Sequence, residues 1–420
     1  MVGTMAKIDD SVKKKVPELR FPGFTDDWEE RKLGEFSDVR DGTHASPKYV
    51  SQGHPMVTSK NLTHSGLDMT DVSFLTDEDF NEINKRSKVS IGDILFGMIG
   101  TIGNPVIVDR DDFAIKNVAL IKEKTSNPIT NKWLLPYLKS PSFNRFIQKE
   151  NAGGTQKFIA LGLIRDMKLR VPEFDEQQKI GSFFKQLDNT ITLHQRKLDL
   201  LKEQKKGYLQ KMFPKNGAKV PELRFAGFAD DWEERKLSSI AERVTRKNKN
   251  NESTLPLTIS AQDGLVDQND YFNKQVASRD VTGYFLVKNG EFAYNKSYSN
   301  GYPWGAIKRL DKYEMGVLST LYIVFKPTAI NSQFLVSYYE TTRWYREVSK
   351  NAAEGARNHG LLNISPNDFF NTLLTIPKSA EEQQQIGSFF KQLDDTIALH
   401  QRKLDLLKEQ KKGFLQKMFV

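Results

Sequence analysis

Cysteine is absent from the 420-residue chain. Disulfide bonds and thiolate metal sites are therefore excluded, and we expect a cytoplasmic protein, because the reducing cytoplasm disfavours disulfides. The amino-terminal sequence MVGTMAKIDDSVKKK lacks the apolar core of a signal peptide. The most apolar stretch, 91–108, is interrupted by Asp93, Pro105 and four glycines. This pattern predicts two strands and a turn rather than a membrane span.

Signatures of the enzymes that modify or cleave DNA are also missing. An adenine methyltransferase needs a cofactor-binding loop and an aromatic-flanked Asn/Asp-Pro-Pro motif, and neither is found. No Walker A loop ending in Gly-Lys-Ser/Thr is present, so we expect no ATP motor in this chain. The acidic run Asp109, Asp111 and Asp112 is interpreted as a solvated turn rather than a metal site. We therefore expect no catalytic, cofactor-binding or metal-binding residue, and a chain that is not itself an enzyme.

Acidic side chains are fewer than basic ones, with 53 Asp and Glu against 62 Lys and Arg, which leaves a net charge of +9. A basic excess attracts polyanions, and nucleic acid is the most common polyanion for a soluble protein. The hydrophobic fraction of 38%, with 27 Phe and 13 Tyr, is sufficient to form folded cores. The length suits two or three domains.

Two segments of the chain are repeated almost unchanged. The segment 16–36 recurs at 220–240 with 16 of 21 positions identical, and the segment 175–213 recurs at 381–419 with 34 of 39 positions identical. Near-identical repeats predict that both copies adopt the same local structure, and two copies can pack about a pseudo-two-fold axis. A tandem duplication without any symmetric function is the alternative.

The regions between the repeats, 37–174 and 241–380, show no obvious likeness to each other. A shared frame that carries two different heads would explain why these two regions differ while the repeats on either side of them are nearly identical. Both heads contain short β-type runs followed by helical segments, which predicts an α+β fold for each. The predicted parts are an N-terminal tail (1–15), a first head (16–172), a first helix (173–213), a linker (214–219), a second head (220–377) and a second helix (378–420).

The long repeat has the composition and the periodicity of a coiled-coil helix. The seam positions, most of them apolar, alternate at spacings of four and three residues. In the first copy these positions are Ile180, Phe184, Leu187, Ile191, His194, Leu198, Leu201, Lys205, Tyr208 and Met212. We expect the two helices to pair antiparallel as a long spacer between the heads. The polar seam residues that would set the register of this pair are His194, Lys205, His400 and Lys411.

DNA recognition needs cations for the phosphates and planar polar groups for the base edges. Loops of both heads offer such side chains. The candidate DNA-binding residues are Thr43, His44, Lys60, Asn61, Thr155, Gln156, Lys157, Arg246, Lys247, Lys296, Ser297, Tyr298, Asn300, Arg357 and Asn358. For each of them the alternative is an ordinary solvated loop residue.

This layout resembles the specificity subunits of type I restriction-modification enzymes, the HsdS family. The resemblance extends from Val16 to Phe419. It is carried by the opening ELRFPGF…W at 18–28, by VPEFDEQQKIGSFFKQLD at 171–188 with its copy IPKSAEEQQQIGSFFKQLD at 376–394, and by GDILF at 92–96. The fold that it implies is α+β with a pseudo-two-fold internal repeat, in which a long antiparallel two-helix coiled coil separates two target recognition domains.

The resemblance also implies a function and partners. Each target recognition domain would read one half of a bipartite site in double-stranded DNA. The helix pair would set the distance between the domains and dock two methyltransferase subunits, and restriction/translocase subunits would complete the complex. S-adenosylmethionine, ATP and Mg²⁺ would then bind to the partner subunits and not to this chain.

Two other functions remain open from the sequence. A self-contained DNA-modifying enzyme with an unrecognised site would transfer a methyl group from S-adenosylmethionine without any partner. A coiled-coil scaffold with no nucleic-acid role would show no salt-dependent DNA binding and no sequence preference.

Overall fold

The computed structural model describes residues 16–64, 66–100, 102–124, 129–150, 158–215, 217–260, 262–297, 301–352 and 362–419 of the chain. The chain forms two compact units. Unit 1 contains the residues up to Gln195 together with those from Arg402 onward, and unit 2 contains Arg196–Gln401. Each unit therefore combines a head with the last part of the other half's long helix.

The head of unit 1 is built on a four-stranded antiparallel sheet in the order β2-β11-β8-β9, and a second four-stranded sheet has the order β10-β4-β7-β3. Its elements are β1 (Glu29–Lys32), α1 (Leu33–Phe36), β2 (Ser37–Asp41), β3 (Tyr49–Val50), β4 (His54–Val57), η1 (Ser59–Asn61), β5 (Leu62–Thr63), β6 (Gly66–Leu67), β7 (Ser73–Leu75), α2 (Asp77–Ser87), β8 (Ile94–Gly97), β9 (Gly103–Ile107), β10 (Ala114–Ile115), β11 (Val118–Glu123), α3 (Asn131–Leu138), α4 (Pro141–Glu150), α5 (Leu161–Asp166) and β12 (Lys168–Val171). The long helix α6 (Phe174–Lys211) follows.

The head of unit 2 repeats the central sheet in the order β14-β21-β18-β19. Its elements are β13 (Glu233–Lys236), α7 (Leu237–Ile240), β14 (Ala241–Arg243), β15 (Leu257–Ser260), β16 (Gly264–Asp267), α8 (Gln268–Phe272), β17 (Phe285–Lys288), β18 (Phe292–Asn295), β19 (Ala306–Arg309), β20 (Met315–Leu318), β21 (Ile323–Pro327), α9 (Ser332–Glu340), α10 (Tyr345–Asn351), α11 (Pro366–Phe370) and β22 (Leu373–Ile376). The long helix α12 (Ala380–Lys417) follows. The α+β content that the sequence predicts is confirmed in both heads.

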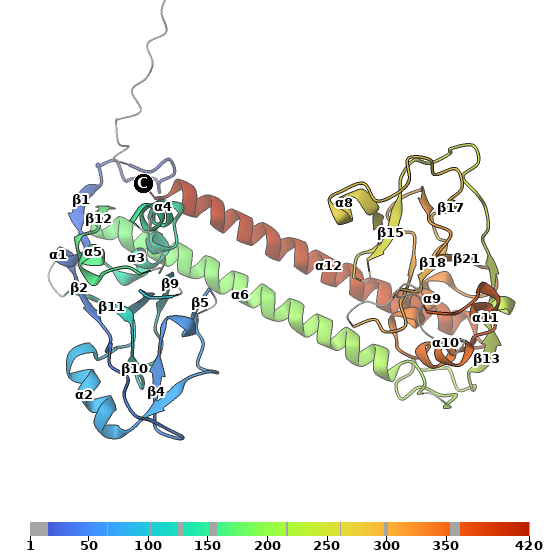
Figure 1. Ribbon diagram of the computed structural model, residues 1–420, viewed down its shortest axis with the longest axis horizontal. Helices are drawn as coiled ribbons and strands as arrows, with labels where there is room; N and C mark the ends of the chain where they lie inside the picture. The colour runs from blue at the N-terminus through green and yellow to red at the C-terminus, as the bar shows by residue number, and fades with distance from the viewer. Residues whose placement is uncertain are drawn as a thin grey trace, which may run out of the picture. The chain divides into compact units, whose positions relative to one another are not determined.

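In unit 1 the first part of α6 packs antiparallel against the last part of α12 (Figure 1). The rings of Phe183 and Phe414 meet edge to face, with centroids 5.0 Å apart. One turn further along α6, Asp188 forms an ion pair with Lys411, which precedes Phe414 on α12. Residue numbers thus rise along one helix as they fall along the other, which confirms the predicted antiparallel pairing.

The same pairing recurs in unit 2 with the roles of the two helices exchanged. Tyr208 of α6 meets Phe389 of α12 edge to face, with ring centroids 5.1 Å apart. Lys205, a predicted polar seam residue, forms ion pairs with Asp394 of α12 and with Glu340 of α9. Desolvation alone would lower the pKa of the Lys205 ammonium, but the two carboxylates together raise it. The seam lysine is therefore charged and satisfied where it is largely buried.

Both long helices end before their predicted segments do, α6 at Lys211 and α12 at Lys417, because the residues after each helix leave it to fill a core. Phe213, just after α6, is 1% exposed and packs edge to face on Trp232. Phe419, just after α12, is 4% exposed and packs on Trp28 of unit 1. The aromatic end of each long repeat thus completes the core of the other half's head. In the described part of the chain, no helix is sufficiently long and apolar to span a membrane.

Candidate nucleic-acid interface

In unit 1 the two repeated motifs meet at one buried carboxylate, that of Glu176. Glu176, in the first turn of α6, is 0% exposed. The guanidinium of Arg20 donates to both of its oxygens, with Nε to Oε1 at 2.7 Å and Nη2 to Oε2 at 2.8 Å. The indole nitrogen of Trp28 donates to Oε2 at 3.1 Å. Three donors from the short repeat therefore satisfy one carboxylate of the long repeat, and the hydrogen bond to Glu176 raises the pKa of Arg20.

Unit 2 contains the same arrangement around Glu382, which is 1% exposed. Arg224 donates to Oε1 at 2.7 Å and to Oε2 at 2.8 Å, and the indole of Trp232 donates to Oε1 at 3.2 Å. We call each Arg–Trp–Glu group a frame cluster. The repeated motifs are therefore structural, because each frame cluster joins the start of a head to the start of the long helix that follows it.

The glutamine that follows the frame glutamate positions the next helix of the head. Gln177 accepts a hydrogen bond from the backbone N–H of Thr130, the N-cap of α3, at 2.9 Å, and donates to the carbonyl of Pro172 at 3.0 Å. The equivalent Gln383 accepts from the backbone N–H of Asn331, the N-cap of α9, at 2.9 Å. The Pro–Glu–Gln pattern of the long repeat thus fixes the head helix against the long helix.

Close helix packing explains the repeated glycine in the same segment. A Cβ atom at Gly181 would lie 2.8 Å from the backbone carbon of Lys132, and one at Gly387 would lie 2.7 Å from the backbone nitrogen of Phe334. Any larger residue would push α3 away from α6, or α9 away from α12. In both units, glycine at this position is therefore needed for the close contact between the long helix and the head helix.

One loop of the first head that the sequence singles out, the loop after β2, meets a turn that the sequence does not single out. The loop after β2 and the turn between β10 and β11 run together, because Thr43 bridges Lys116 in parallel and donates its backbone N–H to Ile115 at 3.0 Å. Lys116 Nζ donates to the hydroxyl of Ser46 at 3.0 Å. We call Thr43, His44, Ser46, Lys116 and Asn117 the first-head loop cluster. Its cations, the exposed His44 and the half-buried Lys116, and the half-buried amide of Asn117 are the groups that phosphates and base edges require.

His44 is held in the first-head loop cluster by both ring nitrogens. Nδ1 lies 2.7 Å from the side-chain oxygen of Asn117, and Nε2 lies 2.9 Å from the carboxylate of Asp41. Both nitrogens can donate only in the imidazolium form. The hydrogen bonds to Asn117 and Asp41 raise the pKa of His44, whereas burial and the nearby Arg86, which also pairs with Asp41, lower it. The net shift favours a cationic side chain.

We predict that DNA binding through this loop weakens as the pH rises. A raised pKa means that the imidazolium is fully present below the ordinary value of about 6.5 and is lost as the pH rises through the folded-state value. Between pH 6 and pH 8, the slope of log K against log salt concentration should fall by roughly one unit, as expected for one lost phosphate contact. Fluorescence anisotropy with a cognate duplex measures this, and His44→Gln should remove the change.

His54→Gln is the matched control, because His54 also faces a carboxylate, that of Asp77 at 3.0 Å, but stacks on Phe80 outside the first-head loop cluster. It should keep the pH dependence of the unmodified protein. A His44→Gln variant that retains the full pH dependence would contradict the assignment.

The candidate DNA-binding residues Lys60 and Asn61 both lie in η1, and Asn61 is unsuited to contact DNA. Asn61 is 3% exposed, and its amide accepts from Thr58 and donates to the backbone oxygens of Asp68 and Asp71. The hydrogen bonds of this amide stabilise the turn, and the buried side chain cannot also bond to a base. Asn61 is therefore not a DNA contact. Lys60 is exposed and pairs with the side chain of Asp71 at 2.9 Å, a surface pair that a phosphate can displace at little cost.

The second head also requires one correction. Arg246 donates to both oxygens of Glu291, a buried residue, and to the carbonyl of Leu286. This guanidinium is the counter-ion of a buried carboxylate and binds β17 and the turn after it, so it is not available for DNA. Lys247 donates to the carbonyl of Gly283 at 2.8 Å and lies over the ring of Phe285 at 4.3 Å, with part of its side chain exposed.

Lys296 and Ser297 follow β18 and are half-buried. The ammonium of Lys296 donates to the carbonyl of Ile364 at 3.3 Å, and burial lowers the pKa of this group. The backbone N–H of Ser297 donates to the side chain of Asn295 at 3.0 Å. The structure therefore places both residues at the base of the turn between β18 and β19.

Seven candidates lie outside the described residues and stay predictions: Thr155, Gln156, Lys157, Tyr298, Asn300, Arg357 and Asn358. The described residues that follow two of these segments lie in equivalent places. Ile159 donates its backbone N–H to Met98, after β8, at 2.9 Å, and Leu362 donates to Lys296, after β18, at 3.0 Å. In each head, a residue that follows the variable segment therefore lies beside the corresponding hairpin of the central sheet.

Sequence reasoning missed Lys116 and Asn117, which complete the first-head loop cluster. The available signal was weak, because the pair lies inside a run that looks like one continuous strand. Asn117 has φ 55°, a left-handed conformation that asparagine tolerates, and it marks the break between β10 and β11. Among the described residues, no group of three or more acidic or histidine side chains is placed to hold a metal ion.

The chain is similar to proteins of one family. Residues 25–203 and 229–409 each match the family described as "Type I restriction modification DNA specificity domain". The chain is 22% identical over 430 residues to the type I restriction enzyme MjaVIII specificity subunit of Methanocaldococcus jannaschii, a match that covers 96% of this chain and 93% of that protein. It is 26% identical over 199 residues to the putative MjaX specificity subunit of the same organism, a match that covers 45% of this chain and 46% of that protein.

The fold is similar to a solved structure. The crystal structure of the type I restriction-modification system S subunit from M. genitalium matches with a TM-score of 0.61 and 16% sequence identity. The match covers 96% of this chain and 99% of that chain. At this identity the likeness concerns the fold alone.

Proposed function

This chain belongs to the type I restriction modification DNA specificity domain family, and we propose that it is the specificity subunit of such a complex. In this role it binds double-stranded DNA and reads a bipartite sequence, with one half-site for each head. The observation that carries the proposal is a pair of identical frame clusters that hold two heads with different loops. A frame kept constant around divergent polar loops suits two different DNA half-sites.

Base recognition is assigned to the loops and not to the frame. Side chains identify a base pair by hydrogen bonds to its edge in the major groove, while phosphate contacts only fix the position of the protein. In the first head, Thr43 and Asn117 offer polar groups beside the cations of His44 and Lys116. In the second head, the candidates Lys247, Lys296 and Ser297 lie on the segments that follow β14 and β18.

Partner subunits are proposed to dock on the long helices. Leucines outside the seam are exposed at equivalent positions of both repeats: Leu193 and Leu406 in unit 1 are 65% and 58% exposed, and Leu399 and Leu200 in unit 2 are 62% and 52% exposed. Exposed apolar side chains on a helix suggest an interface. Because the same leucine pattern is present in both units, each unit can bind one copy of the same methyltransferase subunit.

The chemistry is assigned to those partners. In our proposal the methyltransferase subunits bind S-adenosylmethionine and extrude the target adenine from the duplex before methylation. Restriction/translocase subunits, which use ATP and Mg²⁺, act when the site is unmethylated. This chain selects the site and transfers no group itself.

The proposal is tested by mapping adenine methylation across a host genome with and without a functional copy of this chain. A bipartite sequence should lose methylation when the chain is removed, because the methyltransferase then has no site selection. Methylation that is unaltered in position and extent would contradict the proposal. Purified chain incubated with labelled S-adenosylmethionine should show no transfer to DNA, whereas transfer would favour a self-contained enzyme.

The scaffold alternative is tested by DNA binding. Specific complexes bind their sites roughly 10³–10⁷ times more tightly than other DNA, and binding weakens with salt. Equal affinity for cognate and scrambled duplexes in the assembled complex would favour a scaffold. The converging cations of the first-head loop cluster support the DNA-binding alternative.

A further inference from the structure

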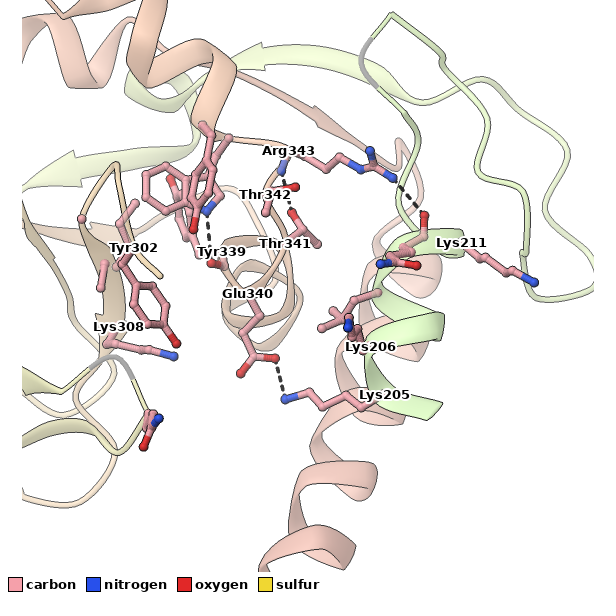
Figure 2. A pocket seen from close by; sticks show the side chains of 18 of the residues that line it. Lys205, Lys206, Lys211, Tyr302, Lys308, Tyr339, Glu340, Thr341, Thr342 and Arg343 are labelled. Carbon is pink, nitrogen blue, oxygen red and sulfur yellow. Dashed lines mark hydrogen bonds and ion pairs between the residues drawn. The ribbon is translucent and has the colours of Figure 1, made fainter. Parts of the chain in front are cut away.

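Unit 2 contains a cavity of about 770 Å³ beside the last turns of α6 (Figure 2). Its walls are formed by α6, by the segment from Tyr302 to Lys308 that leads into β19, and by the connection between α9 and α10. Seven of the side chains that line it are cationic and two are acidic. The cavity therefore has a strong excess of positive charge. Tyr302 and Gly305 belong to the turn between β18 and β19, but none of the cations of the cavity is among the candidate DNA-binding residues.

Both acidic side chains are already paired. Glu340 forms an ion pair with Lys205 at 2.7 Å, and Glu222 forms one with Lys215. Within the described residues, the other five cations of the cavity have no carboxylate within ion-pair distance: Lys202, Lys206, Lys211, Lys308 and Arg343. Arg343 donates instead to the backbone oxygens of Gln210 and Phe213.

Lys308 is the most informative of these cations. It lies on β19, is half-buried, and its ammonium points into the cavity next to Tyr302 (Figure 2). Burial is the main cause that lowers the pKa of Lys308, and the positive charge of Lys205 adds to it. The carboxylates of Glu340, Asp394 and Asp263 act in the opposite direction without reversing the shift. An ammonium that is partly removed from water without an ion pair is unfavourable, and a bound anion would compensate for this.

The helix supplies the opposite wall. Lys202 and Lys206 are one turn apart on α6, a separation of about 6 Å along the axis. Both are exposed, and lysines on flexible stems act as point charges toward a phosphate. Cations of the helix and of the head thus face the same space, where mutual repulsion opposes folding unless a polyanion is bound.

We propose that this cavity binds backbone phosphates of the DNA strand beside the half-site that unit 2 reads, with Lys206 and Lys308 as phosphate contacts. The inference rests on the proposed function and extends it, because it assigns DNA contact to a long helix as well as to the heads. A DNA strand presents phosphates at regular intervals along its length, which suits cations that come from several segments of an open cavity.

The contact also differs between the two half-sites. The helix lysines recur in the second repeat, where Lys408 and Lys412 correspond to Lys202 and Lys206. Lys308 and Arg343, in contrast, belong to the variable region of the second half. The repeated helix lysines are therefore present in both units, and the variable head determines whether further cations stand beside them to bind a phosphate.

The test compares two double variants in the full chain assembled with its methyltransferase subunits. Lys206→Gln/Lys308→Gln removes two cations from the cavity. Lys312→Gln/Lys378→Gln removes two exposed lysines of unit 2 that do not line it, and so matches the change in net charge. For the cavity variant, the slope of log K against log salt concentration should fall by about two units, since each phosphate contact contributes about 0.9. The preferred sequence should stay the same, and the control variant should keep the original slope.

A cavity variant whose slope equals that of the control would overturn the inference. Lys206→Gln alone, at an exposed helix position, gives a version without any risk to folding and should lower the slope by about one unit. Duplexes with single neutral methylphosphonates locate the contact. The unmodified protein should lose affinity at positions that flank one half-site, and the cavity variant should be insensitive at those same positions.

A free nucleotide is the other source of phosphate, and labelled ATP tests it by equilibrium dialysis with the full chain. Saturable ATP binding that the cavity variant loses, together with an unchanged DNA salt slope, would overturn the DNA assignment. If the unmodified complex shows no sequence-specific DNA binding, the proposed function fails and the inference fails with it. If the unmodified complex binds its site specifically but the cavity variant has the same salt slope as the control variant, the inference alone is wrong.

Discussion

Exchanging residues 37–166 for the corresponding segment of another family member should change one half of the recognised DNA sequence and leave the other half unaltered. The boundaries follow from the structure. They keep β1 and β12, which pair in antiparallel register from Glu29 opposite Val171 to Lys32 opposite Lys168. They also keep the frame cluster at Glu176, while the whole first-head loop cluster is replaced.

The expected change is large because a new head presents different side chains to every base pair of its half-site. Each mismatched pair costs about 1–3 kcal/mol of binding free energy, and the costs add for well-separated positions. Methylation mapping of the exchanged chain in a host that carries the methyltransferase subunits measures both half-sites at once.

The matched control is the equivalent exchange in unit 2, between Ala241 and Asn371, which keeps the ladder of β13 and β22. It should change the other half-site only. If either exchange alters both half-sites together, the heads do not read DNA independently and the proposed division of the site is wrong.

Replacing Glu176 by alanine should destabilise unit 1 by about 3–5 kcal/mol, the usual cost of removing one partner from a buried ion pair. Glu176 is 0% exposed, and the side chain of Arg20 is only 13% exposed. The substitution leaves the guanidinium of Arg20 without its counter-ion and the indole of Trp28 without its acceptor. Urea unfolding followed by tryptophan fluorescence measures the loss.

Three further variants separate charge from packing. Glu382→Ala should destabilise unit 2 by a similar amount, because its frame cluster has the same geometry. Asp395→Ala breaks an exposed pair with Lys391 on α12 and should cost less than about 1 kcal/mol. Replacing Arg20 and Glu176 together by apolar residues should recover much of the loss from Glu176→Ala. Equal effects of Glu176→Ala and Asp395→Ala would show that the frame cluster contributes no special stability.

The long helices could be predicted almost completely from the sequence. Their heptads lie within one segment, and near identity of the two copies makes the same prediction twice. The predicted seam is buried or half-buried throughout the long repeat, whereas Leu193 and Leu200, outside the seam, are exposed. Only the ends differ, because Phe213 and Phe419 leave the helical periodicity to fill aromatic cores.

The loop residues were harder to assign, since a polar side chain in a loop looks the same whether it binds DNA or stabilises the turn. Asn61 and Arg246 have the chemistry of base and phosphate contacts, yet both are used within the protein. The partner of Arg246 is Glu291, 45 positions away in the sequence. Contacts over such separations depend on strand order, which no local pattern reveals.

The sequence by itself determined the family, the two-copy frame and the antiparallel helices, because repeats and periodicity are properties of neighbouring residues. The tertiary structure decided which polar groups are satisfied and which stay available. It showed that the frame motif is a buried carboxylate with three donors, with Arg20 and Glu176 separated by 156 positions. It also placed Lys308 of a head opposite Lys206 of a helix around one cavity. Charge pairing acts through space over a few ångströms, so only the folded chain determines which cations remain for DNA.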